Sequence, residues 1–322
     1  MNKRRQNVPA AAGNLQSALV VGAFGRHCLI ETDDGQRLIA HPRGKKNQAV
    51  VGDRVQWAAT GDEASIERLE ERRNLFYRQD EIRTKSFAAN LDRVLILIAA
   101  EPEFSESQLC RALVAAEAEK IKPIIALNKC DLSEPFARAW ERLAPYRAMG
   151  YTVLPLGLAP RSEGLRDDGV AALIDALRGQ HTLVLGPSGS GKSTLINRLV
   201  PEAQAETGEI SQALNSGKHT TTSTRWYWVR ALDGDGQRGA LIDSPGFQEF
   251  GLHHIEPTRL AECMPDLRQY LGQCRFYNCT HLHEPGCAVL AHVGAPQQHA
   301  AISERRHRIY AQLFEELSQQ RW

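Results

Sequence analysis

The chain reads Gly186-Pro187-Ser188-Gly189-Ser190-Gly191-Lys192-Ser193, and this stretch decides the fold of its central part. It matches the pattern G-x-x-x-x-G-K-[ST] at every specified position, after an apolar run and before a segment that favours a helix. A glycine-rich loop in that position wraps a phosphate with inward-pointing N–H groups at the positive end of a helix dipole. The stretch therefore predicts a P-loop fold that binds a nucleoside triphosphate.

Every residue of this loop, together with Thr194 behind it, is expected to contact the nucleotide. Lys192 is expected to bridge the β- and γ-phosphates, and the Ser193 hydroxyl is expected to ligate Mg²⁺. A plain Gly/Ser-rich connecting loop is the alternative, and the strand and helix on its two sides argue against it. The loop by itself does not identify the base of the nucleotide.

The base is indicated by a second motif, Asn128-Lys129-Cys130-Asp131, which follows the apolar run PIIAL and resembles the N-K-x-D motif of GTPases. The Asp131 carboxylate can accept hydrogen bonds from both the ring N–H and the exocyclic amine of guanine, whereas adenine offers the wrong donors there. Lys129 is expected to lie over the base, and Asn128 to join this loop to the phosphate loop. A solvated turn is the alternative, but the position at the carboxyl end of a strand favours a binding site.

The motifs stand in an unusual order along the chain. In ordinary GTPases the guanine motif follows the phosphate loop, whereas here it precedes it. Two later segments complete the set, Lys218-His219-Thr220-Thr221-Thr222 and Asp243-Ser244-Pro245-Gly246. One threonine of the first segment is expected to sense Mg²⁺ and the γ-phosphate. Asp243 is expected to hold Mg²⁺ through water, and the Gly246 N–H to contact the γ-phosphate.

The central part of the chain alternates between apolar runs typical of buried strands and segments typical of helices. The expected strands are Val94–Ile98, Pro123–Leu127, Thr152–Leu156 and Thr182–Leu185, and the expected helices are Ser105–Lys120, a segment from about Ser133, Val170–Leu177 and Lys192–Leu199. Such alternation predicts a parallel sheet with helices on both faces. Residues 81–255 are therefore expected to be an α/β P-loop GTPase domain with circularly permuted motifs.

Residues 16–80 contain short β segments separated by Gly-containing turns. About five such strands predict a small β-barrel of the OB-fold type, with an SH3-like barrel as the alternative. Residues 1–15 lack periodicity and are expected to be a disordered tail. Residues 1–60 also carry nine Lys and Arg against four Asp and Glu. This excess indicates either a nucleic-acid footprint or a solvated face with a basic tail.

Residues 256–322 are expected to form a helical domain that binds one structural zinc ion. Cys274, Cys279, His281 and Cys287 supply the Cys₃His ligand set of a closed tetrahedral site. Four protein ligands leave no position for an activated water, so zinc catalysis is not expected. A cluster of free thiols is the alternative.

Two features beside this cluster have competing interpretations. His283 competes with His281 as the fourth ligand. Phe276 and Tyr277, between the first two cysteines, either stack on RNA bases or fill the small core of the domain, and we expect core filling.

Composition bounds the class of protein. With 42% hydrophobic and 24% charged residues over 322 positions, the chain is typical of soluble globular proteins of two or three domains. The longest apolar run, Val94 to Ala100, is too short to cross a membrane, and the N-terminus lacks the apolar region of a secretory signal. We therefore expect a cytoplasmic protein, and nothing requires more than a monomer. Four further cysteines are expected to be ordinary small residues: Cys28, Cys110, Cys130 and Cys263.

The motif order, together with H-T-T-T and D-S-P-G-F, resembles the circularly permuted GTPases, and most closely the bacterial ribosome small-subunit-dependent GTPase A family. The resemblance extends from the β-barrel through the permuted domain to the C-x₄-C-x-H-x₅-C segment. It implies an N-terminal OB-fold, one zinc ion in the C-terminal domain, and binding to the small ribosomal subunit and its 16S rRNA. It further implies a role in late maturation of that subunit, with GTP hydrolysis stimulated by it.

The resemblance also implies roles for single residues. Thr221, the middle threonine, is the switch residue and a Mg²⁺ ligand, and His281 is favoured over His283 as zinc ligand. Phe247 stands where ordinary GTPases carry a water-positioning Gln. The resemblance suggests His219 for that task, with a structural histidine as the alternative.

One departure concerns the loop after the third strand, where GTPases usually carry a Ser-Ala pair that supports the guanine. This chain reads Leu156-Gly157-Leu158 there. Backbone contacts could persist in such a loop, but no side chain is assigned to that role.

Two other functions stay open on the residues alone. A P-loop kinase or ATPase with a zinc-stabilised regulatory domain would have no use for Asp131. A nucleic-acid-binding module with a degenerate GTPase domain is disfavoured by the intact Lys192, Ser193, Thr221 and Asp243. Within the favoured interpretation, the switch loops, at about 205–225 and 243–254, lead into the zinc domain. We therefore expect γ-phosphate contacts to reposition that domain.

Overall fold

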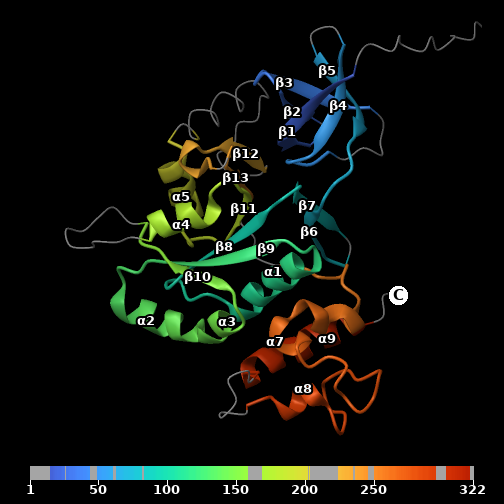
Figure 1. The fold of residues 1–322 in the computed structure, drawn as a ribbon, viewed down its shortest axis with the longest axis vertical. Coiled ribbons are helices and arrows are strands. Elements are labelled where there is room, and N and C mark those ends of the chain that lie inside the picture. The colour runs from blue at the N-terminus through green and yellow to red at the C-terminus, as the bar shows by residue number, and fades with distance from the viewer. Residues whose placement is uncertain are drawn as a thin grey trace, which may run out of the picture.

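The computed structural model describes residues 15–25, 27–43, 49–60, 63–81, 83–158, 169–201, 203, 224–234, 236–245, 250–294 and 302–319. A β-barrel, an α/β region and a helical C-terminal region follow one another along the long axis of the molecule (Figure 1). The expected N-terminal tail lies almost wholly outside the described residues. Across the described ranges, every helix is too short or too polar to cross a membrane.

The N-terminal barrel is built from five short strands. They are β1 (Gln16–Phe24), β2 (His27–Thr32), β3 (Arg37–Pro42), β4 (Arg54–Thr60) and β5 (Glu63–Leu69). Their order is β1-β2-β3-β5-β4, and a pairing of β4 with β1 closes the barrel. Only β3 and β5 run parallel. Alternate residues such as Val20, Ile30 and Ile66 fill its interior. This Greek-key closure confirms the OB-fold.

A hairpin of two strands connects the barrel to the α/β region. It consists of β6 (Leu75–Gln79) and β7 (Thr84–Ala89), which pair antiparallel. The boundary expected at residue 80 falls between these two strands. Asn74 holds the base of the hairpin, because its amide donates to the Leu91 carbonyl and accepts from the Leu91 N–H, both at 2.8 Å.

The central sheet has the order β10-β9-β8-β11-β13-β12. Its strands are β8 (Arg93–Ala99), β9 (Lys122–Asn128), β10 (Thr152–Pro155), β11 (His181–Leu185), β12 (Arg225–Trp228) and β13 (Ala240–Asp243). All neighbours run parallel except β12, which is antiparallel to β13. Strand β12 also pairs with β1, so barrel and central sheet form one continuous sheet. The expected parallel α/β domain is confirmed.

Helices cover both faces of this sheet, as the alternation of elements predicts. They are α1 (Glu106–Ala118), α2 (Ser133–Arg142), α3 (Ala144–Ala148), α4 (Val170–Leu177) and α5 (Lys192–Leu199). In the buried strand β8, Val94 and Ile96 pack in one cluster with Leu113 of α1, whereas Leu95 packs in another with Leu195 of α5. Ser105 caps α1 as predicted, accepting from the Gln108 N–H at 3.3 Å. Both faces of the sheet therefore contribute to the core.

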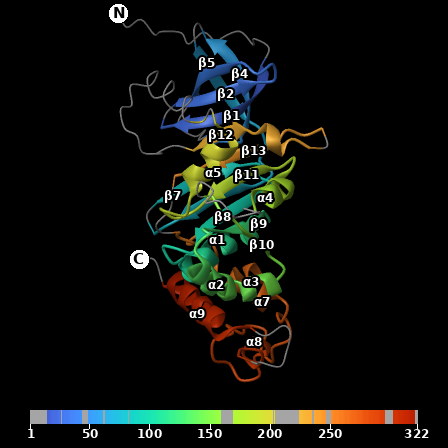
Figure 2. The same cartoon turned by 90° about the vertical axis from the view of Figure 1, so that its left-hand side faces the viewer.

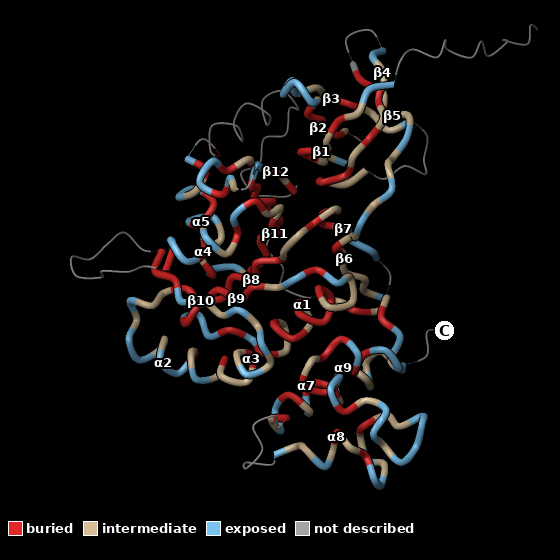
Figure 3. The backbone as a smooth tube through the Cα atoms, in the orientation of Figure 1, coloured by how far each residue is buried: buried red, intermediate tan, exposed pale blue. Residues whose placement is uncertain are grey.

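The C-terminal region consists of short helical segments and one longer helix, joined by loops. Its described elements are η2 (Pro257–Cys263), α7 (Pro265–Arg268), α8 (Ala288–Ala291) and α9 (Glu304–Ser318), of which η2 is a 3₁₀ helix. Leu260, Leu267 and Leu313 join the same apolar cluster as α1. The region lies at the end of the molecule opposite the barrel (Figure 2), and its loops around α8 are largely exposed (Figure 3).

Candidate functional site

The phosphate loop connects β11 to α5, at the carboxyl edge of the parallel strands. Gly189 and Gly191 have φ of +80° and +98°, which favour glycine. A Cβ on Gly191 would lie 2.3 Å from Asn128 Nδ2, and one on Gly186 would lie 2.6 Å from the Leu97 carbonyl oxygen. The loop is therefore shaped by contacts that only glycine permits. Ser193 and Thr194 lie exposed in the first turn of α5.

Lys192 and Asp243 meet at the ends of the neighbouring strands β11 and β13. The Lys192 Nζ lies 2.9 Å from an Asp243 carboxylate oxygen. Ser244, the next residue, donates its hydroxyl to the Val184 carbonyl of β11 at 2.9 Å, which fixes the start of the D-x-x-G segment. The cation expected to hold phosphate and the carboxylate expected to hold Mg²⁺ thus lie at one point of the sheet edge.

Asn128 joins the guanine motif to the phosphate loop, as the sequence predicts. Its side-chain amide donates to the Ser190 carbonyl at 2.9 Å, and its side-chain oxygen accepts from the Leu158 N–H at 3.1 Å. Asn128 itself is only 3% exposed. One buried side chain therefore holds three loops in register at the ends of β9, β10 and β11.

Lys129 and Asp131 follow directly. Lys129 has φ of +68°, a turn of the backbone away from the strand. Asp131 is exposed, so its carboxylate is available to a ligand beside the phosphate loop.

The loop 156–158 contributes backbone groups to the site. The sequence assigns none of its side chains to guanine support. The Cys130 N–H donates to the Leu156 carbonyl at 3.0 Å. An Arg198 guanidinium nitrogen of α5 lies 3.4 Å from the Gly157 carbonyl. Sequence reasoning missed Leu158 and Arg198 as residues that position this loop. Their contacts depend on the packing of α5 against it, and no sequence pattern marks them.

Three predicted site residues lie outside the described residues. They are His219, Thr221 and Gly246. Their expected roles in placing water, binding Mg²⁺ and contacting the γ-phosphate stay predictions.

The segment that follows Gly246 contacts three other parts of the chain. The Gln79 N–H of β6 donates to the Gly251 carbonyl at 3.1 Å, and the His253 N–H donates to the Gln79 carbonyl at 3.0 Å. Arg111 of α1 donates to the Phe250 carbonyl at 3.3 Å and pairs with Glu316 of α9. A groove of about 470 Å³ lies here, and its lining includes Arg111, Phe250, Gly251, His253 and Glu316. The exit of the second switch loop therefore touches the hairpin, α1 and, through Arg111, the C-terminal helix.

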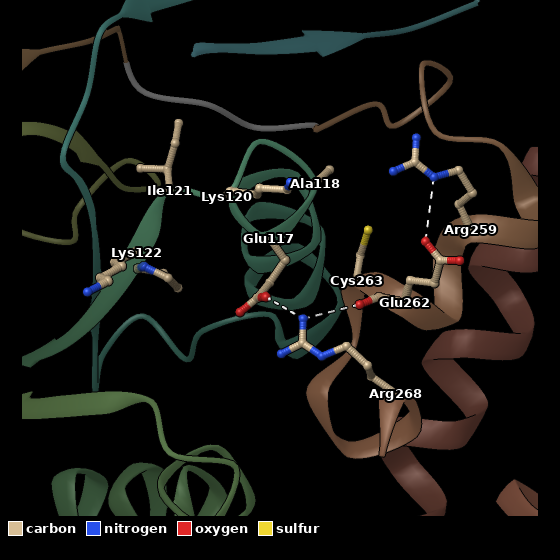
Figure 4. A pocket seen from close by; sticks show the side chains of 10 residues that line it. Glu117, Ala118, Lys120, Ile121, Lys122, Arg259, Glu262, Cys263 and Arg268 are labelled. Atoms are coloured by element: carbon tan, nitrogen blue, oxygen red, sulfur yellow. Dashed lines mark hydrogen bonds and ion pairs between the residues drawn. The ribbon is translucent and has the colours of Figure 1, made fainter. Parts of the chain in front are cut away.

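A second groove, of about 480 Å³, separates α1 and the start of β9 from η2 and α7 (Figure 4). Arg268 crosses it, with its Nη1 donating to a Glu117 carboxylate oxygen at 3.0 Å and to the Glu262 carbonyl at 3.3 Å. Cys263 lies in its wall, and burial raises the pKa of its thiol to about 11. This groove is a polar joint between the C-terminal region and the sheet domain, and Cys263 stays protonated there.

The expected metal ligands converge. The Sγ atoms of Cys274 and Cys287 are 3.9 Å apart, and each lies 3.5 Å from His281 Nδ1. With Cys279, the four donor atoms lie within 4.8 Å of one another. A tetrahedral zinc ion, with bonds of about 2.3 Å to sulfur and about 2.0 Å to nitrogen, separates two sulfurs by about 3.8 Å and sulfur from nitrogen by about 3.5 Å. The donor set therefore fits such an ion, and it includes His281 rather than the exposed His283.

Hydrogen bonds around the cluster hold its ligands in place. His307 Nε2 lies 2.7 Å from the His281 carbonyl, and the Tyr310 hydroxyl donates to the Thr280 carbonyl at 2.7 Å, both from α9. Glu284 accepts from the Thr280 hydroxyl and N–H. Burial raises the pKa of Glu284, but these hydrogen bonds outweigh it and hold the pKa well below its usual range. The loop is thus held by its ligands and these hydrogen bonds, and Val289 connects it to the main apolar cluster.

The rings between the first two cysteines do not fill a core. Tyr277 is 103% exposed and Phe276 is 42% exposed. The expectation of core filling is therefore wrong. A loop this short, pinned at both ends by its cysteines, has no interior into which two rings could turn.

Comparison with known proteins places the chain in a family. The family profile described as RsgA GTPase matches residues 69–253. The Small ribosomal subunit biogenesis GTPase RsgA of Variovorax paradoxus is 66% identical over 308 residues, covering 96% of this chain and 94% of the relative. The protein of the same name from Paraburkholderia phytofirmans is 51% identical over 322 residues, covering 99% of each chain.

Two solved structures share the fold. YjeQ from Thermotoga maritima has a TM-score of 0.70 and 24% identity, over 95% of this chain and 100% of its own. YloQ, described as a circularly permuted GTPase, has a TM-score of 0.67 and 24% identity, over 99% of this chain and 100% of its own. The chain therefore belongs to the RsgA GTPase family, and the predicted class of enzyme, a GTPase, is confirmed.

Proposed function

We propose that the chain binds GTP at the carboxyl edge of its central sheet, hydrolyses it to GDP and phosphate, and acts in this way in biogenesis of the small ribosomal subunit. The observation that carries the nucleotide site is the pair of hydrogen bonds made by Asn128. They hold a carboxylate suited to guanine, Asp131, beside a loop suited to phosphates. An ATPase or kinase would gain nothing from that carboxylate.

Each motif that faces the phosphates has its own role. The backbone N–H groups of residues 186 and 188–193 surround the phosphates, and Lys192 neutralises charge that develops in the transition state. Mg²⁺, held by Ser193 and Thr221 and through water by Asp243, would supply further charge neutralisation on the β- and γ-phosphates. The Gly246 N–H contacts the γ-phosphate, and His219 places the attacking water in the position that Phe247 cannot serve.

The four ligands Cys274, Cys279, His281 and Cys287 hold one zinc ion with a structural role. The separations of their donors suit zinc bonds to three sulfurs and one nitrogen. A complete set of protein ligands leaves no open position for water, so the ion stabilises the region and does not take part in hydrolysis.

The partner is the small ribosomal subunit with its 16S rRNA, and the subunit stimulates hydrolysis late in its own maturation. Support comes from the names of relatives that match nearly the whole chain, and from the excess of Lys and Arg over residues 1–60. In this arrangement residues 16–80 and 256–322 bind rRNA at the two ends of the molecule, and residues 81–255 carry the GTPase. The protein acts as a monomer in the cytoplasm.

The deciding experiment measures phosphate release from GTP, and from ATP as a control, with and without purified small subunits. We expect slow hydrolysis of GTP alone, strong stimulation by the subunit, and loss of both rates in Lys192→Ala. Lys122→Ala is the matched control, because Lys122 is exposed at the opposite end of the sheet. Hydrolysis of GTP that ignores the subunit would remove the ribosomal role and leave the enzyme. A preference for ATP would overturn the role of Asp131.

A further inference from the structure

The loop between the first two metal ligands presents two aromatic rings to solvent. All four of its residues, 275–278, are exposed. Across the described residues, the exposed large hydrophobic side chains are Leu15, Ile39, Phe276 and Tyr277. Two of these four are therefore neighbours on a single short loop, which we call the 275–278 loop.

The rings stand on a fixed base. Cys274 and Cys279 bound the loop and belong to the converging metal ligands. The Arg275 N–H donates to the Gly286 carbonyl at 3.1 Å, and the Cys279 N–H donates to the Phe276 carbonyl at 3.3 Å. Because the backbone is held in this way, a partner that binds the rings orders little additional chain, which favours affinity.

Folding does not account for the position of Tyr277. A side chain exposed to 103% buries no surface and so contributes no hydrophobic stabilisation. The loop is also cationic. Arg275 is exposed and its guanidinium carbon lies 5.5 Å from the centroid of the Phe276 ring, while the nearby Glu284 carboxylate accepts hydrogen bonds from Thr280 and from its own turn.

We propose that the 275–278 loop binds single-stranded RNA, with unpaired bases stacking on Tyr277 and Phe276 and with Arg275 contacting the backbone. This inference rests on the proposed ribosomal function and names the surface that meets the RNA. Aromatic rings beside arginine are the features with which proteins capture unstacked bases, whereas duplex RNA offers no open base face. A protein partner would instead favour aromatic anchors inside a wider apolar patch, and the neighbours of these rings are Arg275 and Asn278.

The test measures binding of a fluorescently labelled single-stranded RNA oligonucleotide of mixed sequence to the zinc-loaded full chain, by anisotropy at constant salt. The same sequence as a duplex is the comparison. We expect Tyr277→Ala to weaken single-strand binding by about fivefold to about 100-fold. Tyr277→Phe retains the ring and should bind within about twofold of the parent chain, whereas Tyr277→Leu retains apolar surface without the ring and should resemble the alanine variant. Zinc content should be unchanged in all three, because Tyr277 buries nothing.

Unchanged single-strand binding in Tyr277→Ala would overturn the proposal, and so would an equal loss for the duplex. A photoreactive phenylalanine analogue at position 277 extends the test to the small ribosomal subunit. Cross-links to rRNA support the proposal, and cross-links confined to ribosomal proteins contradict it. Stimulation of GTP hydrolysis by the subunit is measured in parallel on the parent chain. If the subunit does not stimulate hydrolysis, the proposed function is wrong. If it does stimulate hydrolysis and Tyr277→Ala binds RNA as the parent chain does, only this inference is wrong.

Discussion

The nucleotide site and the metal site solve the same problem, holding a few polar groups in fixed positions, by opposite means. The guanine and phosphate loops emerge from β9 and β11, whose apolar residues are almost completely buried between two layers of helices. The metal ligands lie in turns between residues 270 and 287. In the described range 270–294, α8 is the one regular helix. At the nucleotide site a large core positions the polar groups, whereas at the metal site the ligand atoms themselves hold the turns together and few apolar side chains help.

The two regions are therefore vulnerable in different ways. A loop that depends on a large core tolerates the loss of one of its own contacts, because the strands beneath it remain. A region built around a metal ion, as we propose for the metal site, has no such reserve, since the free energy of metal binding is then the free energy of folding.

Loss of the metal has the largest expected effect. Chelation, or Cys279→Ser, should unfold residues 270–294, with a loss on the order of 10 kcal/mol of binding free energy. Amide hydrogen exchange followed by mass spectrometry should show these peptides unprotected while β8 and β11 keep their protection. Cys263→Ser is the matched control, because Cys263 is a buried cysteine of the same region outside the ligand set. Equal protection with and without metal would show that the region has a core of its own.

The buried ion pair of the same region comes next. Arg306 is 2% exposed and binds Asp266 through two hydrogen bonds of 2.9 Å. Arg306→Met leaves the Asp266 carboxylate buried without its cation, so we expect a loss of about 3–5 kcal/mol in the free energy of unfolding. Urea denaturation, monitored through the release of zinc, measures this free energy of unfolding. The double variant Arg306→Met/Asp266→Leu should recover most of the loss, because it removes both charges. A double variant as unstable as the single one would contradict this account.

Sequence reasoning predicted the sheet-based part of the molecule well. The phosphate loop, the guanine motif and the strands carrying them follow local rules in which pattern and fold agree. The three cysteine ligands also follow from their clustering, whereas the choice of His281 over His283 needed the family resemblance. The exposure of Tyr277 could not be predicted, because a residue flanked by ligands looks the same in sequence whether it turns inward or outward. Leu158 and Arg198 were missed because they act through backbone contacts between segments far apart in the chain.

The link between the two nucleotide loops has a smaller expected effect. Asn128→Ala leaves the Ser190 carbonyl and the Leu158 N–H without their partner, at a cost of about 1–3 kcal/mol. GTP affinity, measured by calorimetry, should fall about tenfold or more because the guanine and phosphate loops lose their register.

Asn74→Ala is the matched control for this change. Asn74 also makes two backbone hydrogen bonds, to Leu91 at the base of the hairpin, far from the nucleotide loops. It should reduce stability by a similar amount and leave GTP affinity unchanged. If both variants lose affinity equally, the effect of Asn128 is general destabilisation and the link has no special role.

The contact of His254 with the hairpin gives the smallest effect, and it depends on pH. His254 ends the expected second switch loop and packs against the Tyr77 ring of β6, with ring centroids 4.3 Å apart. Neither of its ring nitrogens has a hydrogen-bond partner among the described residues. Burial, followed by the neighbouring His253, lowers the pKa of His254 to about 4.

Because the pKa of His254 is lower in the folded chain than the value of about 6.5 in the unfolded chain, the unfolded chain binds more protons between these values. The contribution of His254 is therefore fully present above pH 6.5 and is lost as the pH falls from 6.5 toward 4. Solvent screens the partly exposed ring, so we expect a loss of no more than about 1 kcal/mol. His254→Phe keeps the ring contact and removes the titration. The urea midpoint of each chain is expressed as a fraction of its highest value over the pH range. These fractions should agree at pH 7.5 and diverge at pH 5, where the parent chain should lose more. Parallel profiles would mean that the imidazole is solvated, and that His254 does not stay packed against Tyr77 as the ring contact indicates.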